Sequence, residues 1–130
     1  QQDEFIAITK KLGLDPDKMP VSATPSYGWG GAMGPAQFLP ATWLMYESQI
    51  AFHSGHSPPN PWNNTDAFFA SALYLRDLGA SAQNETAEWT AAMKYLAGSN
   101  WKKPSLRFYG DHVMEIASRI QEDIRTMEGK

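Results

Sequence analysis

The carboxyl side chains are the residues of this sequence with the clearest potential for chemistry. A carboxyl group that acts as a general acid in glycoside cleavage needs a raised pKa, and therefore an apolar pocket. Glu47 lies among the aromatic residues Trp43, Tyr46 and Phe52, which makes it the best candidate in the chain for such an acid. The alternative is a solvated position on a helix face, which is the more frequent place for a glutamate.

The other common catalytic side chains offer less. The chain has no cysteine, which excludes a thiol nucleophile, a disulfide and cysteine-ligated zinc. His53 and His56 are three residues apart, but Gly55, Pro58 and Pro59 predict a polar loop there rather than a metal site. No serine elbow is present, and the glycine-rich stretch neither follows a strand nor has the spacing of a phosphate loop. We expect no metal and no organic cofactor.

The aromatic residues, 12% of the chain, are more informative. Tyr27 and Trp29 lie in a glycine-rich stretch, where small neighbours would let a ring face a ligand. Sugars present C–H faces that stack on such rings. For Trp29 and Trp62, a structural anchor is an equally good interpretation, and for Trp43 and Trp89 the helical spacing favours the core.

Helices must position these residues, because apolar side chains recur every three or four residues and no alternating strand pattern is present. We expect helices from Asp3 to a stop at Gly13, from Thr42 to Phe52, from a cap at Thr65 or Asp66 to Gly79, from a cap at Thr86 to a stop at Gly98, and from Asp111 onward. The third should bury Phe69, Ala72, Leu73 and Leu75, and the last should carry an apolar stripe of Val113, Ala117, Ile120 and Ile124. Residues 14–41 form a long irregular segment, with a short helical turn at 34–38, and such segments are often functional.

Length and composition limit the possibilities further. The chain has 130 residues, 42% of them hydrophobic, which fits one domain over residues 1–130 with a mainly α fold of about five helices around one core and little or no sheet. The net charge of −3, with no run of lysine and arginine, makes nucleic acid an unsuitable partner. No apolar stretch approaches the roughly 20 residues of a membrane span.

Residues 30–43 carry an unusual string, GGAMGPAQFLPATW. It closely resembles the G-A-M-G-x-x-Q-F-x-P signature of lytic transglycosylases, in particular the membrane-bound-type-B-like and soluble branches of the lysozyme-like superfamily. Residues 5–22, 66–79, 91–101 and 108–113 resemble the family as well. The resemblance therefore covers nearly the whole chain.

This resemblance implies a lysozyme-like helical fold and action on peptidoglycan. Such enzymes cleave the β-1,4 bond between N-acetylmuramic acid (MurNAc) and N-acetylglucosamine (GlcNAc) without water. One glutamate protonates the leaving oxygen and then, as a carboxylate, accepts the proton of the muramic C6 hydroxyl, which attacks C1 and leaves a 1,6-anhydro end. One carboxyl group therefore suffices where ordinary glycosidases use two.

The resemblance also implies roles for single residues. Gln37 would hydrogen-bond the substrate, since an amide both donates and accepts. Met33 and Phe38 would shape the groove, and Tyr95 would lie beside the reacting sugar. Ser26 would correspond to a substrate-contacting serine, in a loop that is two residues longer here. The alternative for Gln37 and Met33 is a buried loop scaffold.

One part of the family pattern has no counterpart here. The family's catalytic glutamate lies several tens of residues before the signature, and no glutamate of this chain matches it; Glu4 belongs to the intervening helix. We therefore expect a C-terminal fragment of the catalytic domain that is inactive by itself. The alternatives are a non-catalytic peptidoglycan-binding or scaffold module, and an enzyme that uses a relocated carboxylate, Glu47.

The substrate sets the expected partner and compartment. Peptidoglycan glycan strands lie outside the cytoplasmic membrane, so we expect a periplasmic, envelope or secreted bacterial protein. A groove left open beside the signature would expose apolar surface, and dimerisation through that surface is a further expectation.

Overall fold

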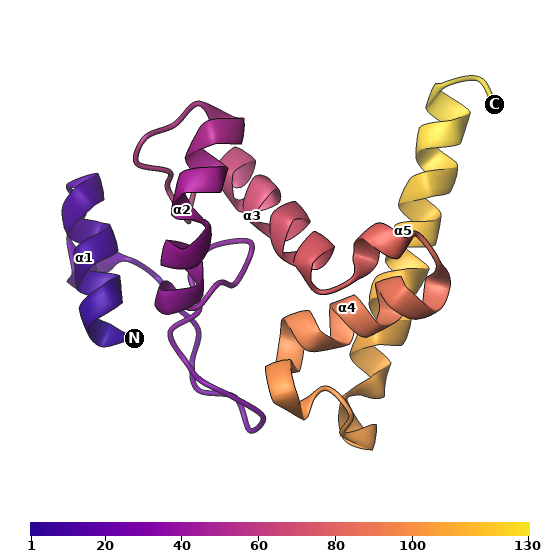
Figure 1. Cartoon of the computed structure of the whole chain (residues 1–130), viewed down its shortest axis with the longest axis horizontal. Helices are drawn as coiled ribbons and strands as arrows, with labels where there is room; N and C mark the ends of the chain where they lie inside the picture. Colours follow the sequence, from indigo (N-terminus) through magenta and orange to yellow (C-terminus); the bar gives the residue numbers. More distant parts are fainter. The chain divides into compact units, whose positions relative to one another are not determined.

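The computed structural model describes all residues from 1 to 130. It contains five α-helices, four short 3-10 turns and no strand, which confirms the expected mainly α class (Figure 1). The elements are α1 (Gln2–Leu12), η1 (Pro16–Lys18), α2 (Pro40–Ser54), α3 (Asn64–Asp77), η2 (Ala80–Ala82), α4 (Glu85–Ala97), η3 (Gly98–Asn100), η4 (Pro104–Leu106) and α5 (Arg107–Met127).

The chain forms two compact units, unit 1 (Gln1–Leu73) and unit 2 (Tyr74–Lys130). Unit 1 holds α1, α2 and most of α3, and unit 2 holds α4 and α5. Each unit has its own buried side chains. A single domain over residues 1–130 stays a prediction.

In unit 1, α1 packs against α2. Ile8 and Thr9 are the buried residues of α1. Asp3 does not cap the helix as expected, because the helix already begins at Gln2; it lies in the first turn, where a carboxylate favours the helix dipole. Gly13 ends the helix with a φ of 67°, as its position in the sequence predicted.

Helix α2 begins two residues earlier and ends two residues later than expected. Pro40 occupies its first turn, where a missing N–H breaks no hydrogen bond, and Gly55 ends it with a φ of 77°. Trp43, Tyr46 and Ile50 follow one another at helical spacing and are buried. This face of α2 is the centre of the core of unit 1.

The start of α3 differs from the expected cap at Thr65 or Asp66. The Oδ1 of Asn63 accepts a hydrogen bond from the backbone N–H of Asp66 at 3.1 Å, so Asn63 takes the capping role. Asp66 itself is only 1% exposed. Ala72, expected in the core, is exposed, because the buried side of α3 runs through different positions. That side consists of Asp66, Ala67, Ala70 and Leu73.

In unit 2, α4 packs against α5. The Oδ1 of Asn84 accepts a hydrogen bond from the backbone N–H of Ala87 at 2.9 Å, so Asn84 caps α4 in place of the expected Thr86. The buried residues of α4 are Ala91, Ala92, Met93 and Ala97.

Helix α5 begins at Arg107, four residues before the expected Asp111. Gly110 lies inside the helix because of packing: a Cβ there would come within 2.5 Å of the Trp89 Nε1 and 2.9 Å of the Met93 Sδ. The Trp89 Nε1 donates a hydrogen bond to Asp111 Oδ1 at 2.8 Å. The glycine therefore allows close contact between α4 and α5 and does not end an element.

The C-terminal part of α5 carries the apolar spacing of the sequence on an exposed face. Ile120 is 53% exposed and Ile124 is 42% exposed. Periodicity thus predicted the helix correctly, and these two apolar side chains of the stripe are exposed. No helix is both long and apolar enough to span a membrane.

Candidate functional site

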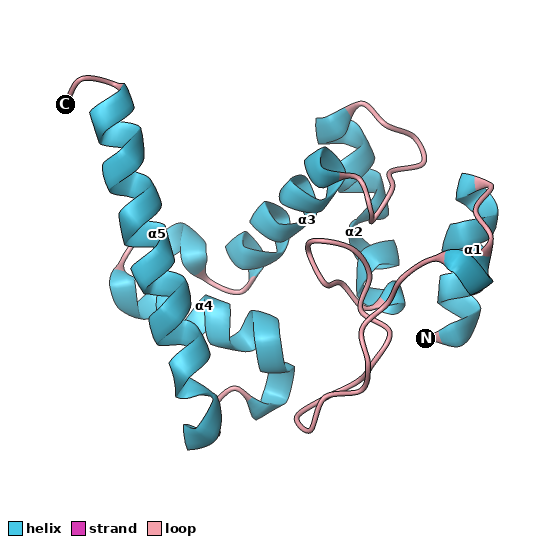
Figure 2. Ribbon diagram, turned by 180° about the vertical axis from the view of Figure 1, so that it is seen from behind, coloured by secondary structure: helices cyan, strands magenta, loops and turns pink.

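Residues 21–39, which we call the 21–39 loop, connect η1 to α2 and carry most of the signature. The backbone N–H of Ser22 donates to the Ala32 carbonyl, and the N–H of Gly31 donates to the Ser22 carbonyl, both at 2.9 Å. The Ser22 Oγ accepts a third hydrogen bond from the Ala32 N–H at 3.0 Å. These bonds tie the outgoing and returning arms together, and Figure 2 shows the loop running out beyond this point and back.

The tip of the loop holds three of the expected ligand-contacting residues. Trp29 is 74% exposed, Ser26 is exposed and Tyr27 is half-buried. Behind them the arms approach so closely that a Cβ at Gly30 would lie 2.7 Å from the Thr24 Oγ1 and 2.8 Å from its backbone nitrogen. The indole ring of Trp29 is therefore exposed to solvent at the tip of a loop whose two arms lie close together.

Residues 34–37 form a tight turn rather than the expected short helical turn. The Met33 N–H donates to the Phe38 carbonyl at 2.9 Å and closes the turn. The Gly34 carbonyl accepts from both the backbone N–H of Gln37, at 3.1 Å, and its side-chain Nε2, at 2.9 Å. Gln37 is exposed, and its φ of 54° is left-handed, a conformation that a residue other than glycine adopts at a cost.

Gly34 seats this turn against the loop of residues 55–63. Its φ is 59°, and a Cβ there would lie 2.0 Å from the Pro61 carbonyl oxygen and 3.2 Å from the Trp62 Cα. Both opposing atoms belong to the backbone. Only glycine fits this contact, so the second glycine of the G-A-M-G motif has a steric reason.

Met33 and Phe38 flank the turn in the sequence, and both are buried. Met33 has no exposed surface and Phe38 is 2% exposed. The Phe38 ring meets Trp43 edge to face at 5.9 Å and Tyr46 at 6.0 Å, both on α2. Met33 and Phe38 are thus buried, and Gln37 is the exposed polar side chain of the turn.

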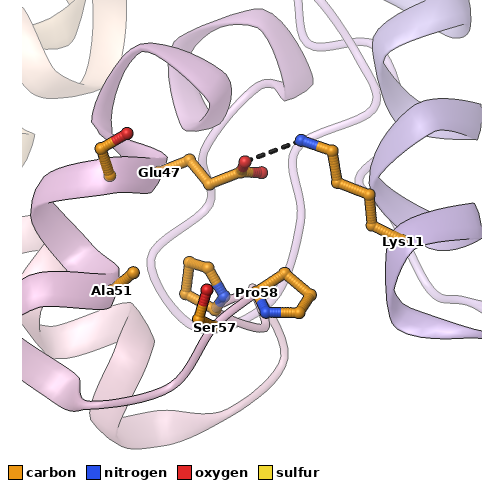
Figure 3. Close-up of a pocket in the computed structure, with 7 residues that line it drawn as sticks. Lys11, Glu47, Ala51, Ser57 and Pro58 are labelled. Carbon is orange, nitrogen blue, oxygen red and sulfur yellow. Dashed lines mark hydrogen bonds and ion pairs between the residues drawn. The ribbon is translucent and has the colours of Figure 1, made fainter.

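Glu47 lies on α2 beside a pocket of about 340 Å³. Its Oε1 accepts a hydrogen bond from the Lys11 Nζ of α1 at 2.7 Å, and the two side chains point toward one another in Figure 3. Of the aromatic residues expected around it, Trp43 is buried in the core and Phe52 is 83% exposed. The pocket is lined by Lys11, Glu47, Ser48, Ala51, Ser57, Pro58 and Pro59.

A buried carboxylate that sequence reasoning missed organises the 55–63 loop. The Asp66 Oδ1 contacts the His56 Nδ1 at 2.8 Å, and its Oδ2 accepts from the Asn60 backbone N–H at 2.9 Å. His56 is half-exposed and forms an ion pair with Asp66 when protonated. The sequence feature that could have indicated this role is a carboxylate one residue before the apolar stretch of α3, which was interpreted as a helix cap.

Tyr95, the last of the predicted site residues, lies on α4 in unit 2. Its ring is tilted against that of Tyr74, with 5.2 Å between the centroids. Burial raises the pKa of the Tyr74 hydroxyl above its ordinary value.

Unit 1 holds the other predicted site residues. Six of them lie on one loop, with Glu47 on the following helix: Ser26, Tyr27, Trp29, Met33, Gln37 and Phe38.

The side chains offer no ready metal centre, because no three histidine or acidic residues gather into a cluster that could hold an ion. His56 has one acidic partner, Asp66.

Comparison with known proteins identifies the family of the chain. The family model of the transglycosylase SLT domain matches residues 1–126. Neither the curated proteins nor the solved structures give a significant match. The family match confirms the resemblance that residues 30–43 suggested and the lysozyme-like character of the helical fold. The chain belongs to the transglycosylase SLT domain family, whose function is related to peptidoglycan.

Proposed function

We propose that this chain binds the glycan strands of peptidoglycan through the 21–39 loop. We further propose that the glycan strand it binds is a substrate of non-hydrolytic cleavage at the MurNAc-β-1,4-GlcNAc bond, which gives 1,6-anhydroMurNAc ends. The setting would be the bacterial periplasm, the cell envelope or the exterior, where this polymer lies. The support comes from the family match over residues 1–126 and from the geometry of the signature turn.

The observation that carries the proposal is the backbone of Gln37. A left-handed φ of 54° costs free energy, and such conformations cluster at functional sites. The turn holds one N–H of the Gln37 amide on the Gly34 carbonyl. The second N–H and the Oε1 are then available to donate to one sugar group and accept from another.

The loop tip supports the same ligand. The exposed Trp29 ring and the neighbouring Tyr27 provide surfaces on which the C–H face of a sugar can stack. Ser26 adds a hydroxyl beside them. Tyr95 is proposed to act beside the reacting sugar, on the basis of the family resemblance alone.

Cleavage of the glycan strand would also need a general acid. No glutamate of the chain matches the catalytic glutamate of the family, so we propose that this chain binds glycan strands without cleaving them. The alternative is that Glu47 acts as the acid. Its place beside a pocket favours that role, but the Lys11 ammonium at 2.7 Å and the open, mixed polar and apolar lining differ from the apolar enclosure that a general acid needs.

Two measurements test the proposal. The chain is incubated with purified peptidoglycan, its retention on the insoluble polymer is measured, and the soluble products are analysed by mass spectrometry. We expect retention and no released muropeptides. Anhydro-muropeptides would contradict the non-cleaving role and would make Glu47→Gln the next variant.

A matched pair of variants tests the site. Gln37 and Gln83 are both exposed glutamines with left-handed φ angles, 54° and 56°, but only Gln37 lies in the signature. Gln37→Ala should weaken retention roughly five- to tenfold, as expected for the loss of one or two hydrogen bonds, and Gln83→Ala should leave it unchanged. Equal behaviour of the two variants would remove the 21–39 loop from the binding site.

A further inference from the structure

Residues 94–107 of unit 2 differ in charge from the rest of the chain. The stretch contains four cations and no carboxylate, although the whole chain has a net charge of −3. Only two of the four cations are adjacent in the sequence, so the stretch contains no long basic run. The four cations are Lys94, Lys102, Lys103 and Arg107.

Two of these cations converge on one indole ring. The Lys94 Nζ lies 5.5 Å and the Lys102 Nζ 5.4 Å from the centroid of Trp101. In the same unit, the Arg107 guanidinium lies 5.4 Å from the ring centroid of Trp89. We call Lys94, Lys102 and Trp101 the Trp101 cluster.

No carboxylate of the chain neutralises this cluster. The ion pairs of the structure involve Lys11, Lys18, Arg76, Lys130, His56 and the chain's amino terminus. Lys94 and Lys102 have the face of the Trp101 ring as their contact instead. Ring contact attracts each ammonium group, but the two like charges still repel one another. A bound anion would relieve that repulsion and keep the ring contact.

We propose that the Trp101 cluster binds the free carboxylates of the peptide stems attached to peptidoglycan glycan strands. This inference rests on the proposed function, because the glycan would bring the stems to the protein. Two ammonium groups act as point charges that suit a carboxylate without demanding a fixed geometry. The half-buried indole adds an apolar surface for the methyl and methylene groups of a peptide.

The cluster would also help a net-negative chain to approach a wall that carries carboxylates. Local positive potential speeds association even where the total charge opposes it, and the effect acts over about 8 Å at physiological ionic strength. Binding through the cluster should therefore weaken as salt is raised. Stacking of sugars on the 21–39 loop should respond less.

The test uses the full chain and two soluble probes. One is a set of muropeptides with free carboxylates, and the other is the same set after carbodiimide amidation of those carboxylates. The indole N–H signal of Trp101 in a nuclear magnetic resonance titration reports binding at the cluster itself. We expect it to shift with the first probe and to stay in place with the second.

Two double variants separate this cluster from general charge. Lys94→Gln with Lys102→Gln should lower the affinity for the free-carboxylate muropeptides roughly tenfold, in line with the loss of two charge contacts. Lys10→Gln with Lys130→Gln removes the same charge from exposed positions outside the cluster and should change little. Equal effects of the two double variants would overturn the inference.

The remaining outcomes distinguish the inference from the proposed function. If the Trp101 signal responds equally to the amidated muropeptides, carboxylate recognition is wrong. If it does not respond to any probe, the cluster is not a site, whether or not the Gln37-dependent retention on the insoluble wall persists. If that retention is absent while the Trp101 response to carboxylates remains, the proposed glycan site fails and the cluster stands.

Discussion

The 21–39 loop in unit 1 and the helix α5 in unit 2 are built on different physical grounds. The loop has no regular secondary structure, yet identifiable contacts fix its course: Ser22 holds its two arms, and Gly34 seats its turn against the Pro61 backbone. Helix α5 is a regular element of 21 residues, and its C-terminal half exposes the apolar side chains that its periodicity lines up.

The two regions should differ in how strongly a single substitution changes the stability of the protein. In the loop, each contact depends on one residue of one type, so a single substitution should have a large effect. In the exposed half of α5, backbone hydrogen bonds carry the structure and the side chains have few neighbours, so substitutions should have small effects.

Gly34→Ala should have the largest effect. The left-handed φ of 59° and the clash with the Pro61 carbonyl together predict a loss of about 3–5 kcal/mol in the free energy of unfolding, measured by urea denaturation. The control is Gly13→Ala, where φ is 67° and a Cβ would meet nothing within 4 Å. There only the backbone strain remains, about 1–2 kcal/mol. Similar losses would mean that the contact with Pro61 is not closely packed.

Asp66→Ala comes next, because it removes a buried acceptor. The His56 ring and the Asn60 N–H would both lose their partner, which predicts a loss of about 2–3 kcal/mol. The control lies near the other end of α3, where Asp77 pairs with Arg76 at an exposed position. Asp77→Ala should cost at most about 1 kcal/mol. If thermal unfolding shows the reverse order, the 55–63 loop is not anchored by Asp66.

The two regions also show what sequence could and could not predict. The string around Met33, Gly34 and Gln37 identified the family, because long motifs carry more information than periodicity. It did not reveal that Gln37 has a left-handed φ or that Met33 is fully buried, since both follow from the fold around the turn. The roles of the site residues therefore stay predictions, and their positions are now known.

Some predictions of helix boundaries and of buried residues were wrong, and the physical reason differs from helix to helix. Helix α5 was expected to begin after Gly110, but there the glycine serves close packing against Trp89. Asp66 was interpreted as a cap because aspartate is common at helix starts, whereas Asn63 makes that hydrogen bond. Ile120 and Ile124 match a buried helical face, and periodicity contains no information about what covers such a face.

Trp43→Phe should have a smaller effect than the size of the residue suggests. Trp43 is fully buried beneath Phe38 of the loop, but its Nε1–H has no hydrogen-bond partner. Replacement by phenylalanine therefore breaks no hydrogen bond and should cost only about 1 kcal/mol, whereas Trp43→Ala should cost about 3–5 kcal/mol through the cavity it leaves. A loss for Trp43→Phe of about 2 kcal/mol in urea denaturation would indicate that a hydrogen-bond partner satisfies the indole N–H.

Ile120→Gln, in the exposed stripe of α5, should have the smallest effect. Glutamine has a helix propensity at least as good as that of isoleucine, and the side chain is already 53% exposed, so the free energy of unfolding should change by less than about 0.5 kcal/mol. The control in the same unit is Met93→Ala, which empties a fully buried position of α4 and should cost about 2–5 kcal/mol. A loss for Ile120→Gln that approaches the loss for Met93→Ala, and that grows with protein concentration, would show that a second copy covers the stripe. The contrast between the two regions would then reflect assembly and not the type of element.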